Sequence, residues 1–311
     1  MVVGFIMETP IADLVEIGIC TRNRWRDLQS TLEQIRGFGW AGLKLTVIDD
    51  GSDQACDFDL VGILPKASLI RHEVSAGYIS RRNELAQIIQ SKYYLSLDDD
   101  SYPIQGDLSA ALEFAESKPN LLCLGFAIRD RGSIAGPTPA DHVGLSLAAG
   151  FIGCGHLLSR QTFLNLGGYY EPLFHQGEEL EIAARGFYYG KECWRFPGCE
   201  IYHNYSQNAR NYSRMDFYGS RNKLWWLFWY CPGPFLFSRV MRSVVERIYL
   251  TLKTGRTGHL RGTYAAFAHY REHRQRVRRF SREQFKEWNR RLCRPMVGTR
   301  SGPDVTLRDG K

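Results

Sequence analysis

The sequence predicts an α/β fold: a doubly wound, mostly parallel sheet flanked by helices. Two observations support this fold class. Short apolar runs typical of buried strands alternate with segments of helical periodicity between residues 14 and 128. In addition, three of these runs lead directly into polar loops, after Cys20, Ile48 and Leu97. Ligands collect outside the carboxyl ends of the strands in such sheets, so the sequence predicts a binding site at that edge.

The expected elements follow one another in a regular order. Leu14–Cys20 is a compact apolar run that fits a buried strand, and Leu28, Leu32 and Ile35 then share one face of a helix. Further strands are expected at 43–48, 68–72, 93–97 and 121–128. Further helices are expected at 80–90, 108–117 and 178–188, and a short amphipathic element at 161–166. From residue 238 onward apolar residues recur at helical spacing among basic ones, which predicts a helical C-terminal region.

The charge is distributed unevenly along the 311 residues. The net charge is +7, but residues 239–300 carry 17 Lys and Arg against four Glu and no Asp, so this segment alone has an excess of +13. The rest of the chain is therefore acidic, at about −6. A basic region of this kind suits contact with anionic lipid, phosphate or nucleic acid, and equally suits a solvated helical surface.

Cysteine use and hydropathy indicate a cytoplasmic protein. The eight cysteines form no C-x-x-C pair, which favours buried free thiols in a reducing compartment. Acidic residues interrupt any signal-peptide pattern near the N-terminus. Residues 224–237 are strongly aromatic, but they are shorter than the ~20 residues of a membrane span and contain Pro232 and Pro234. We therefore expect a cytoplasmic location, with the inner face of the membrane as a candidate contact.

An acidic triplet, Asp98-Asp99-Asp100, follows the strand expected at 93–97. Three consecutive carboxylates repel one another, so a counter-charge is expected beside them. A hard divalent cation that also binds substrate phosphate oxygens would supply it. The alternative interpretation is an acidic turn or helix cap before Pro103.

The triplet belongs to an ordered set of short motifs. The set is Thr21-Arg22-Asn23-Arg24, Val47-Ile48-Asp49-Asp50-Gly51-Ser52, Gly77 with Arg81-Arg82-Asn83, Leu97-Asp98-Asp99-Asp100, Gly153-Cys154-Gly155, Gly167-Gly168-Tyr169, Gly177-Glu178-Glu179-Leu180-Glu181 with Arg185, His203 and Arg221-Asn222. In this order the motifs resemble family 2 glycosyltransferases of the GT-A fold, including rhamnosyltransferase-like, bacterial-type nucleotide-sugar transferases. The resemblance covers roughly residues 15 to 225.

The resemblance implies roles for individual residues. Thr21, Arg24 and Arg82 would lie on the nucleotide, and Asp50 would contact its base. Asp100 would be the firmest ligand of a Mn²⁺ or Mg²⁺ ion. Asp98 would lie on the ribose side and also at the metal, with Asp99 next to it on the donor. Gly153 and Gly155 would lie near the sugar. His203 would lie at the metal or the diphosphate. For His203, an ordinary histidine at a strand end is an equal alternative.

Relatives usually carry Glu-Asp where this chain has Glu178-Glu179, and the second carboxylate serves as the general base. An acceptor hydroxyl must lose its proton as it attacks, and a positioned carboxylate contributes on the order of 10²–10⁴-fold. Glu179 is the matching position and is favoured over Glu178, although glutamate is one methylene longer. Acidic residues in a first helical turn also complement the helix dipole without any catalytic role.

The resulting hypothesis is an inverting, metal-dependent glycosyltransferase that uses a UDP- or dTDP-linked sugar. The acceptor would be a glycan, a lipid-linked or a small-molecule hydroxyl, with peripheral membrane contact and no nucleic-acid partner. The alternatives are a nucleotidyltransferase acting on a sugar phosphate and a basic nucleic-acid-binding protein. The expected organisation is a catalytic domain at 1–222 (nucleotide half 14–105, acceptor half 106–222), an aromatic then basic helical appendage at 223–300, and a flexible tail at 301–311.

Overall fold

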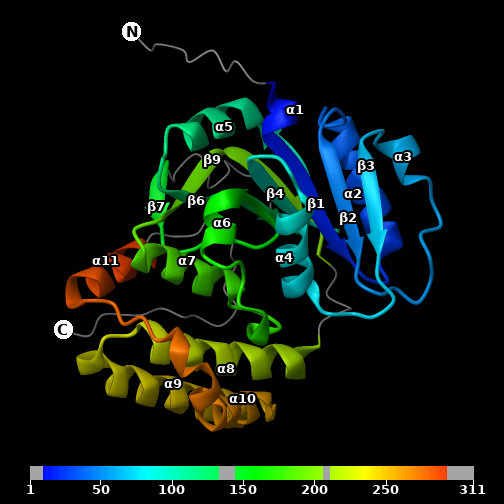
Figure 1. The fold of residues 1–311 in the computed structure, drawn as a ribbon. Coiled ribbons are helices and arrows are strands. Elements are labelled where there is room, and N and C mark those ends of the chain that lie inside the picture. Colours follow the sequence, from blue (N-terminus) through cyan, green and yellow to red (C-terminus); the bar gives the residue numbers. More distant parts are fainter. Residues whose placement is uncertain (1–9, 133–143, 206–210, 293–311) are drawn as a thin grey trace.

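The structure, a computed structural model, describes residues 10–132, 144–205 and 211–292. It contains a sheet domain with helices on both faces, and a layer of helices against one end of that domain (Figure 1). The expected tail at 301–311 lies outside the described residues.

In the described residues nine strands form one sheet, in the order β3-β2-β1-β4-β8-β6-β9-β5, and β7 pairs with β9. Six strands run in one direction, whereas β5, β7 and β8 run against it. The predicted mostly parallel sheet is therefore confirmed. The strands are β1 (Val15–Thr21), β2 (Lys44–Asp49), β3 (Ala67–Arg71), β4 (Tyr93–Asp98), β5 (Ser101–Gly106), β6 (Leu121–Asp130), β7 (Ser146–Ala148), β8 (Gly155–Ser159) and β9 (Glu192–His203).

Helices cover the sheet because its strands bury side chains on both faces. In β4, Leu95 and Leu97 belong to one apolar cluster, whereas Tyr94 belongs to the other. The helices of the sheet domain are α1 (Ile11–Leu14), α2 (Trp25–Gly37), α3 (Leu60–Ile63), α4 (Tyr78–Ile88), α5 (Leu108–Glu116), α6 (Arg160–Asn165) and α7 (Glu178–Tyr188). Every strand and helix expected from the sequence up to residue 188 is present, within a few residues of its expected bounds.

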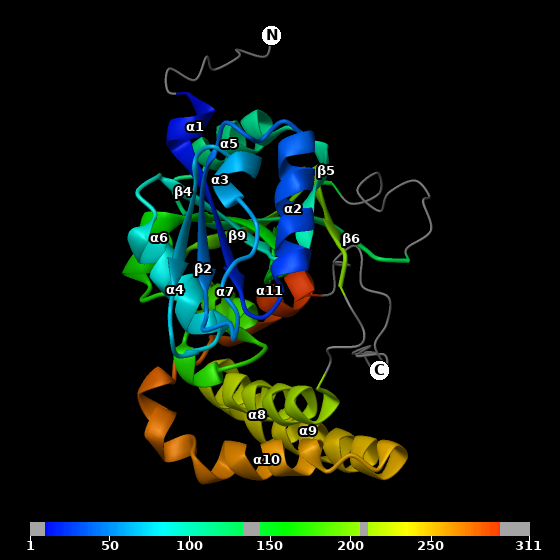
Figure 2. The same ribbon diagram turned by 90° about the vertical axis from the view of Figure 1, so that its right-hand side faces the viewer.

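We call the described residues 211–292 the helical layer (Figures 1 and 2). It contains α8 (Tyr212–Tyr230), α9 (Gly233–Thr254), α10 (Gly258–Ala268), the 3-10 segment η4 (Tyr270–Arg276) and α11 (Arg282–Leu292). The expected boundary between residues 222 and 223 falls inside α8. This helix therefore contains both the Arg221-Asn222 motif and the beginning of the expected aromatic appendage. Within the described parts of the chain, no helix is long and apolar enough to cross a membrane.

Two contacts fix the helical layer. Helix α10 lies so close to α8 that a Cβ at Gly262 would sit 2.1 Å from the carbonyl oxygen of Phe217. Helix α11 returns to the sheet domain, where Trp288 packs against Trp226 of α8 and Phe187 of α7, at centroid separations of 5.7 and 5.5 Å. The layer is thereby joined to α7, the helix that begins with Glu178-Glu179.

Candidate active site

The predicted convergence of three strand ends is confirmed. Strand β1 lies between β2 and β4 and runs parallel to both, so that Thr21 pairs with Asp49 and Cys20 with Asp98. The loops that follow these strands therefore meet at one edge of the sheet.

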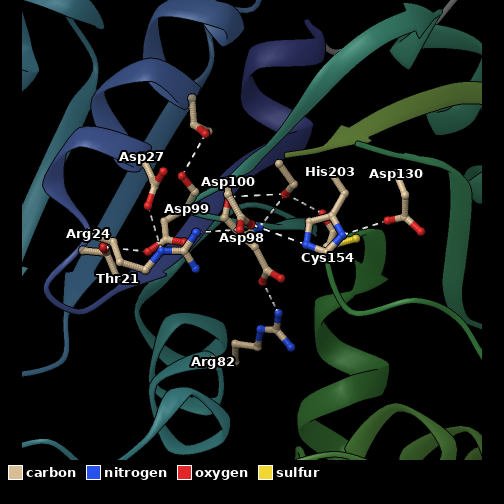
Figure 3. A network of polar contacts seen from close by, with 12 residues as sticks. Thr21, Arg24, Asp27, Arg82, Asp98, Asp99, Asp100, Asp130, Cys154 and His203 are labelled. Carbon is tan, nitrogen blue, oxygen red and sulfur yellow. Dashed lines mark hydrogen bonds and ion pairs between the residues drawn. The ribbon is translucent and has the colours of Figure 1, made fainter. Parts of the chain in front are cut away.

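The loop after β1 is tied to the middle residue of the acidic triplet. Thr21 Oγ1 donates to Asp99 Oδ2 at 2.8 Å, and Nη1 of Arg24 lies 3.2 Å from Asp99 Oδ1. Burial raises the pKa of the Asp99 carboxyl to about 8, against the opposing charge of Arg24. Arg24 also pairs with Asp100 at 2.6 Å. Asp99 therefore holds Thr21 and Arg24 in place at the strand end (Figure 3).

The outer residues of the triplet form a cluster with His203 (Figure 3). Asp98, Asp100 and His203 each offer one ligand atom, and these atoms lie within 4.8 Å of one another. Nε2 of His203 is 3.5 Å from Oδ1 of Asp100. Carboxylate oxygens suit Mg²⁺ and Mn²⁺, and neutral imidazole is a common metal ligand. The three residues thus fit the divalent cation that the resemblance implies.

Asp130, at the end of β6, is a site residue that the sequence did not reveal. Its Oδ1 lies 3.1 Å from Nδ1 of His203, which leaves Nε2 on the side of Asp100. A carboxylate on the far nitrogen typically fixes the tautomer and orientation of a metal-binding histidine. The two residues are register partners in the parallel pair of β6 and β9, 73 positions apart in sequence.

Arg82 connects the acidic triplet to the two glutamates. It is buried, pairs with Asp98 and donates to the carbonyl of Gly153 at 3.0 Å. Its Nη1 lies 3.7 Å from Glu178 and 3.8 Å from Glu179. Burial disfavours the guanidinium charge, but the surrounding carboxylates, Asp98 foremost, keep the pKa of Arg82 well above its ordinary value. One buried cation thus lies among three acidic side chains.

Glu178 and Glu179 begin α7 and differ in exposure. The side chain of Glu178 is 1% exposed, whereas that of Glu179 is 19% exposed. Burial, reinforced by the charge of Glu178, raises the pKa of Glu179 well above its ordinary value, and Arg82 opposes this rise. Glu179 is therefore the more accessible of the two carboxylates and has a raised proton affinity, as a general base needs.

The two glycines near the site have different surroundings. A Cβ at Gly153 would lie 2.1 Å from Oε1 of Glu179, so any side chain there would displace that carboxylate. At Gly155, on β8, a Cβ would meet Ile201 and Ile128 of the sheet at 2.8 and 2.9 Å. Glycine at 153 thus makes room for Glu179, whereas glycine at 155 permits close packing of the sheet.

The loop before α7 is held by α8. Phe174 and Gln176 have φ values of 60° and 66°, in the region that favours glycine. Asn222 Nδ2 donates to the carbonyls of Leu173, His175 and Gln176 at 3.0, 3.0 and 2.6 Å. Arg221 donates to the carbonyls of Pro172 and Leu173 in the same loop. The Arg221-Asn222 motif therefore positions the segment that leads into Glu178-Glu179.

Glu181, one turn further along α7, is a buried junction with the helical layer. It accepts from Arg185 at 2.5 Å, from the hydroxyl of Tyr230 at 2.8 Å and from Arg276 at 2.6 Å. The pair of Glu181 and Arg185 that the i,i+4 spacing predicts is present. The additional partners join α7 to α8 and η4.

Asp50, expected at the nucleotide base, is engaged by four protein donors. Its oxygens accept from Ser75 Oγ, the backbone N–H groups of residues 76 and 77, and Arg81 Nε, at 2.6 to 2.9 Å. Burial would raise the pKa of Asp50, but these hydrogen bonds outweigh it and the pKa is lowered. In this structure Asp50 orders the start of α4, and its contact with a base stays a prediction.

Three solved structures share this fold at low sequence identity. The crystal structure of GalNAc-T7 with UDP, GalNAc and Mn²⁺ has a TM-score of 0.52 and 16% identity, and the match covers 68% of this chain and 50% of that chain. S. aureus TarS 1–349 has a TM-score of 0.52 and 13% identity, over 69% of this chain and 65% of that one. The mannosyltransferase PcManGT from Pyrobaculum calidifontis, in complex with GDP-Man and Mn²⁺, has a TM-score of 0.50 and 13% identity, over 89% and 79%. This chain thus spans half of the first neighbour and about two thirds of the second.

The chain has the GT-A fold of these structures, with an acidic cluster at the end of β4. Residues 16–171, half of the chain, match the model described as glycosyl transferase family 2. The chain belongs to this family. No curated protein matches it in sequence.

Proposed function

We propose that the protein transfers a sugar, with inversion, from a UDP- or dTDP-linked donor to an acceptor hydroxyl. The observation that carries this proposal is the short path from Asp98 through Arg82 to Glu178 and Glu179. Through Arg82, the cluster suited to a divalent cation at the end of β4 and the two candidate bases at the start of α7 lie close together. Two of the neighbouring structures contain a nucleotide or nucleotide sugar together with Mn²⁺, which supports the same donor chemistry here.

In the proposed mechanism each group has one task. Glu179 accepts the proton of the acceptor hydroxyl, whose oxygen attacks the anomeric carbon from the side opposite the departing nucleoside diphosphate. Asp98, Asp100 and His203 would hold the cation, which would neutralise the charge on that diphosphate. Arg82 holds Asp98 and reduces the repulsion between it and the glutamates. Arg24 and Thr21 line the nucleotide side.

We also propose that the protein is cytoplasmic and contacts a membrane surface through its helical layer. The seven cysteines among the described residues are free thiols, which supports a reducing compartment. Helix α9 exposes Phe237, Met241, Val245 and Leu252, at spacings of four and seven residues along one face. An amphipathic helix with basic flanks suits an anionic interface.

A screen of nucleotide sugars tests the proposal. Thermal unfolding would be followed with UDP-, dTDP- and GDP-linked sugars, each with Mn²⁺ and with a chelator. We expect a rise in Tm for one nucleotide class only when Mn²⁺ is present. No stabilisation by any nucleotide sugar would refute the proposed activity. A rise with a sugar phosphate and a nucleoside triphosphate instead would support the nucleotidyltransferase alternative.

A further inference from the structure

A cavity of about 940 Å³ lies between α7 and the helical layer. Its walls come from the loop before α7, from α7 itself, and from α8, α9 and α11. The cavity is close to the upper end of the usual volume of small-molecule sites. It adjoins the active site, because Gly177 and Leu180 line it and flank Glu178-Glu179 on either side in the sequence.

The wall of the cavity is apolar but contains polar donors without acceptors. Eight leucine, tryptophan and phenylalanine side chains line it. Among its lining residues, five buried donors have no hydrogen-bond partner in the described structure: the indole N–H groups of Trp226, Trp229 and Trp288, Ser243 Oγ and Arg247 Nε. A buried donor without an acceptor costs about 1–3 kcal/mol, and these five atoms are enclosed in the wall rather than exposed to the open space of the cavity.

One wall of the cavity is also positively charged. Lys223 and Arg247 line it and share the carboxylate of Glu246. Arg239 and Arg242 line it as well, and neither forms an ion pair with a described residue. The wall formed by α8 and α9 therefore has four cations against one neighbouring anion. The remaining lining carboxylate, Glu181, is already engaged by Arg185 and Arg276.

We propose that this cavity binds the acceptor, and that the acceptor is an anionic amphiphile: a long-chain phosphate or diphosphate ester that carries the sugar whose hydroxyl attacks the donor. The apolar chain would occupy the tryptophan- and leucine-lined interior, and the phosphate would pair with Arg239 and Arg242. This inference rests on the proposed function, and it selects the lipid-linked class among the acceptors considered. The exposed apolar side of α9 would place the cavity at the surface from which such a molecule is drawn.

Binding of decyl phosphate, measured by isothermal titration calorimetry below its aggregation concentration, tests the inference. Decanol supplies the chain without the charge, and inorganic phosphate supplies the charge without the chain. Gly219→Leu on α8 narrows the cavity, because a Cβ there meets only the flexible end of the Gln176 side chain, at 3.0 Å, and leucine favours a helix. Arg239→Gln with Arg242→Gln removes the unpaired charge, and Lys253→Gln, exposed near the end of α9, is the matched control.

We expect decyl phosphate to bind at one site, and decanol and inorganic phosphate each to bind with an affinity at least about tenfold lower. Gly219→Leu and the double arginine variant should each weaken decyl phosphate binding by about tenfold or more, whereas Lys253→Gln should not change it. Equal binding by wild type and Gly219→Leu, or equal binding of decanol and decyl phosphate, would overturn the inference.

UDP binding in the presence of Mn²⁺, measured on the same proteins, separates the two proposals. Nucleotide binding without decyl phosphate binding would reject the cavity and leave the donor chemistry intact. Decyl phosphate binding as expected, without binding of any nucleotide sugar in the screen, would reject the transferase proposal and support the cavity as an amphiphile site.

Discussion

Replacement of Asn222 by alanine tests whether the helical layer positions the general base. The variant removes a side-chain amide whose two N–H groups reach three carbonyls of the loop before α7, which at about 1 kcal/mol for each N–H group is about 2 kcal/mol in all. Phe174 and Gln176 have positive φ values, which cost about 1–2 kcal/mol each. The free-energy cost of the two positive φ values is comparable to the free energy of the lost hydrogen bonds. The observed conformation of the loop before α7 should therefore no longer be strongly favoured in the variant.

The expected result is a fall in kcat of about 10- to 100-fold, equivalent to about 1.4–2.7 kcal/mol. The dissociation constant of the nucleoside diphosphate with Mn²⁺ should stay within about twofold of wild type, because Asn222 contacts none of the donor-side residues. Steady-state transfer rates and calorimetric nucleotide binding would be measured side by side. Asn165→Ala, an exposed asparagine on α6, is the control. An unchanged kcat, or an equal loss of nucleotide affinity, would refute this account of Asn222.

Three further predictions concern α7. Glu179→Gln should bind nucleotide normally but lose transfer by about 10²–10⁴-fold, and a larger loss in Glu178→Gln would reverse the assignment of the base. Transfer should fall as the pH drops through the raised pKa of Glu179, because the base is then protonated. Glu178→Gln removes a neighbouring negative charge, so it should lower the pKa of Glu179 and shift this fall in the transfer rate to lower pH. A pH–rate profile that does not move in Glu178→Gln would contradict this. Glu181→Gln leaves Arg185 and Arg276 without their anion and should lower the free energy of unfolding by about 3 kcal/mol in urea titrations, whereas wild-type stability would contradict the junction.

The nucleotide half of the fold could be predicted because its information is local. Apolar runs and helical periodicity identify every element from Val15 to Asp98 except the short helix α3, and parallel strands must end at a common edge. The convergence of Thr21, Asp50 and the acidic triplet follows from that alone. The structure adds that Asp99 and Asp50 accept hydrogen bonds from protein donors, whereas Asp98 and Asp100 cluster with His203. The sequence alone does not distinguish these aspartates.

The second half was less predictable because its pairings are long-range. Strands β5, β7, β8 and β9 were not expected, since β8 inserts antiparallel between β4 and β6 and β9 is interrupted by register shifts. Asp130 reaches His203 only through such a pairing. Helix α8 was not expected in full because Leu224–Tyr230 is buried all round, which removes the polar face that marks a helix.

The Mn²⁺ dependence of nucleoside diphosphate binding is the sharpest test of the metal cluster at the end of β4. Calorimetric titrations of wild type and Asp100→Ala would be made with Mn²⁺ and with a chelator, using the nucleotide that the screen identifies. The metal cluster of Asp98, Asp100 and His203 predicts strong binding by wild type with Mn²⁺ only, and loss of this dependence in the variant. Equal binding with Mn²⁺ and chelator, or wild-type behaviour of Asp100→Ala, would contradict the assignment of this site.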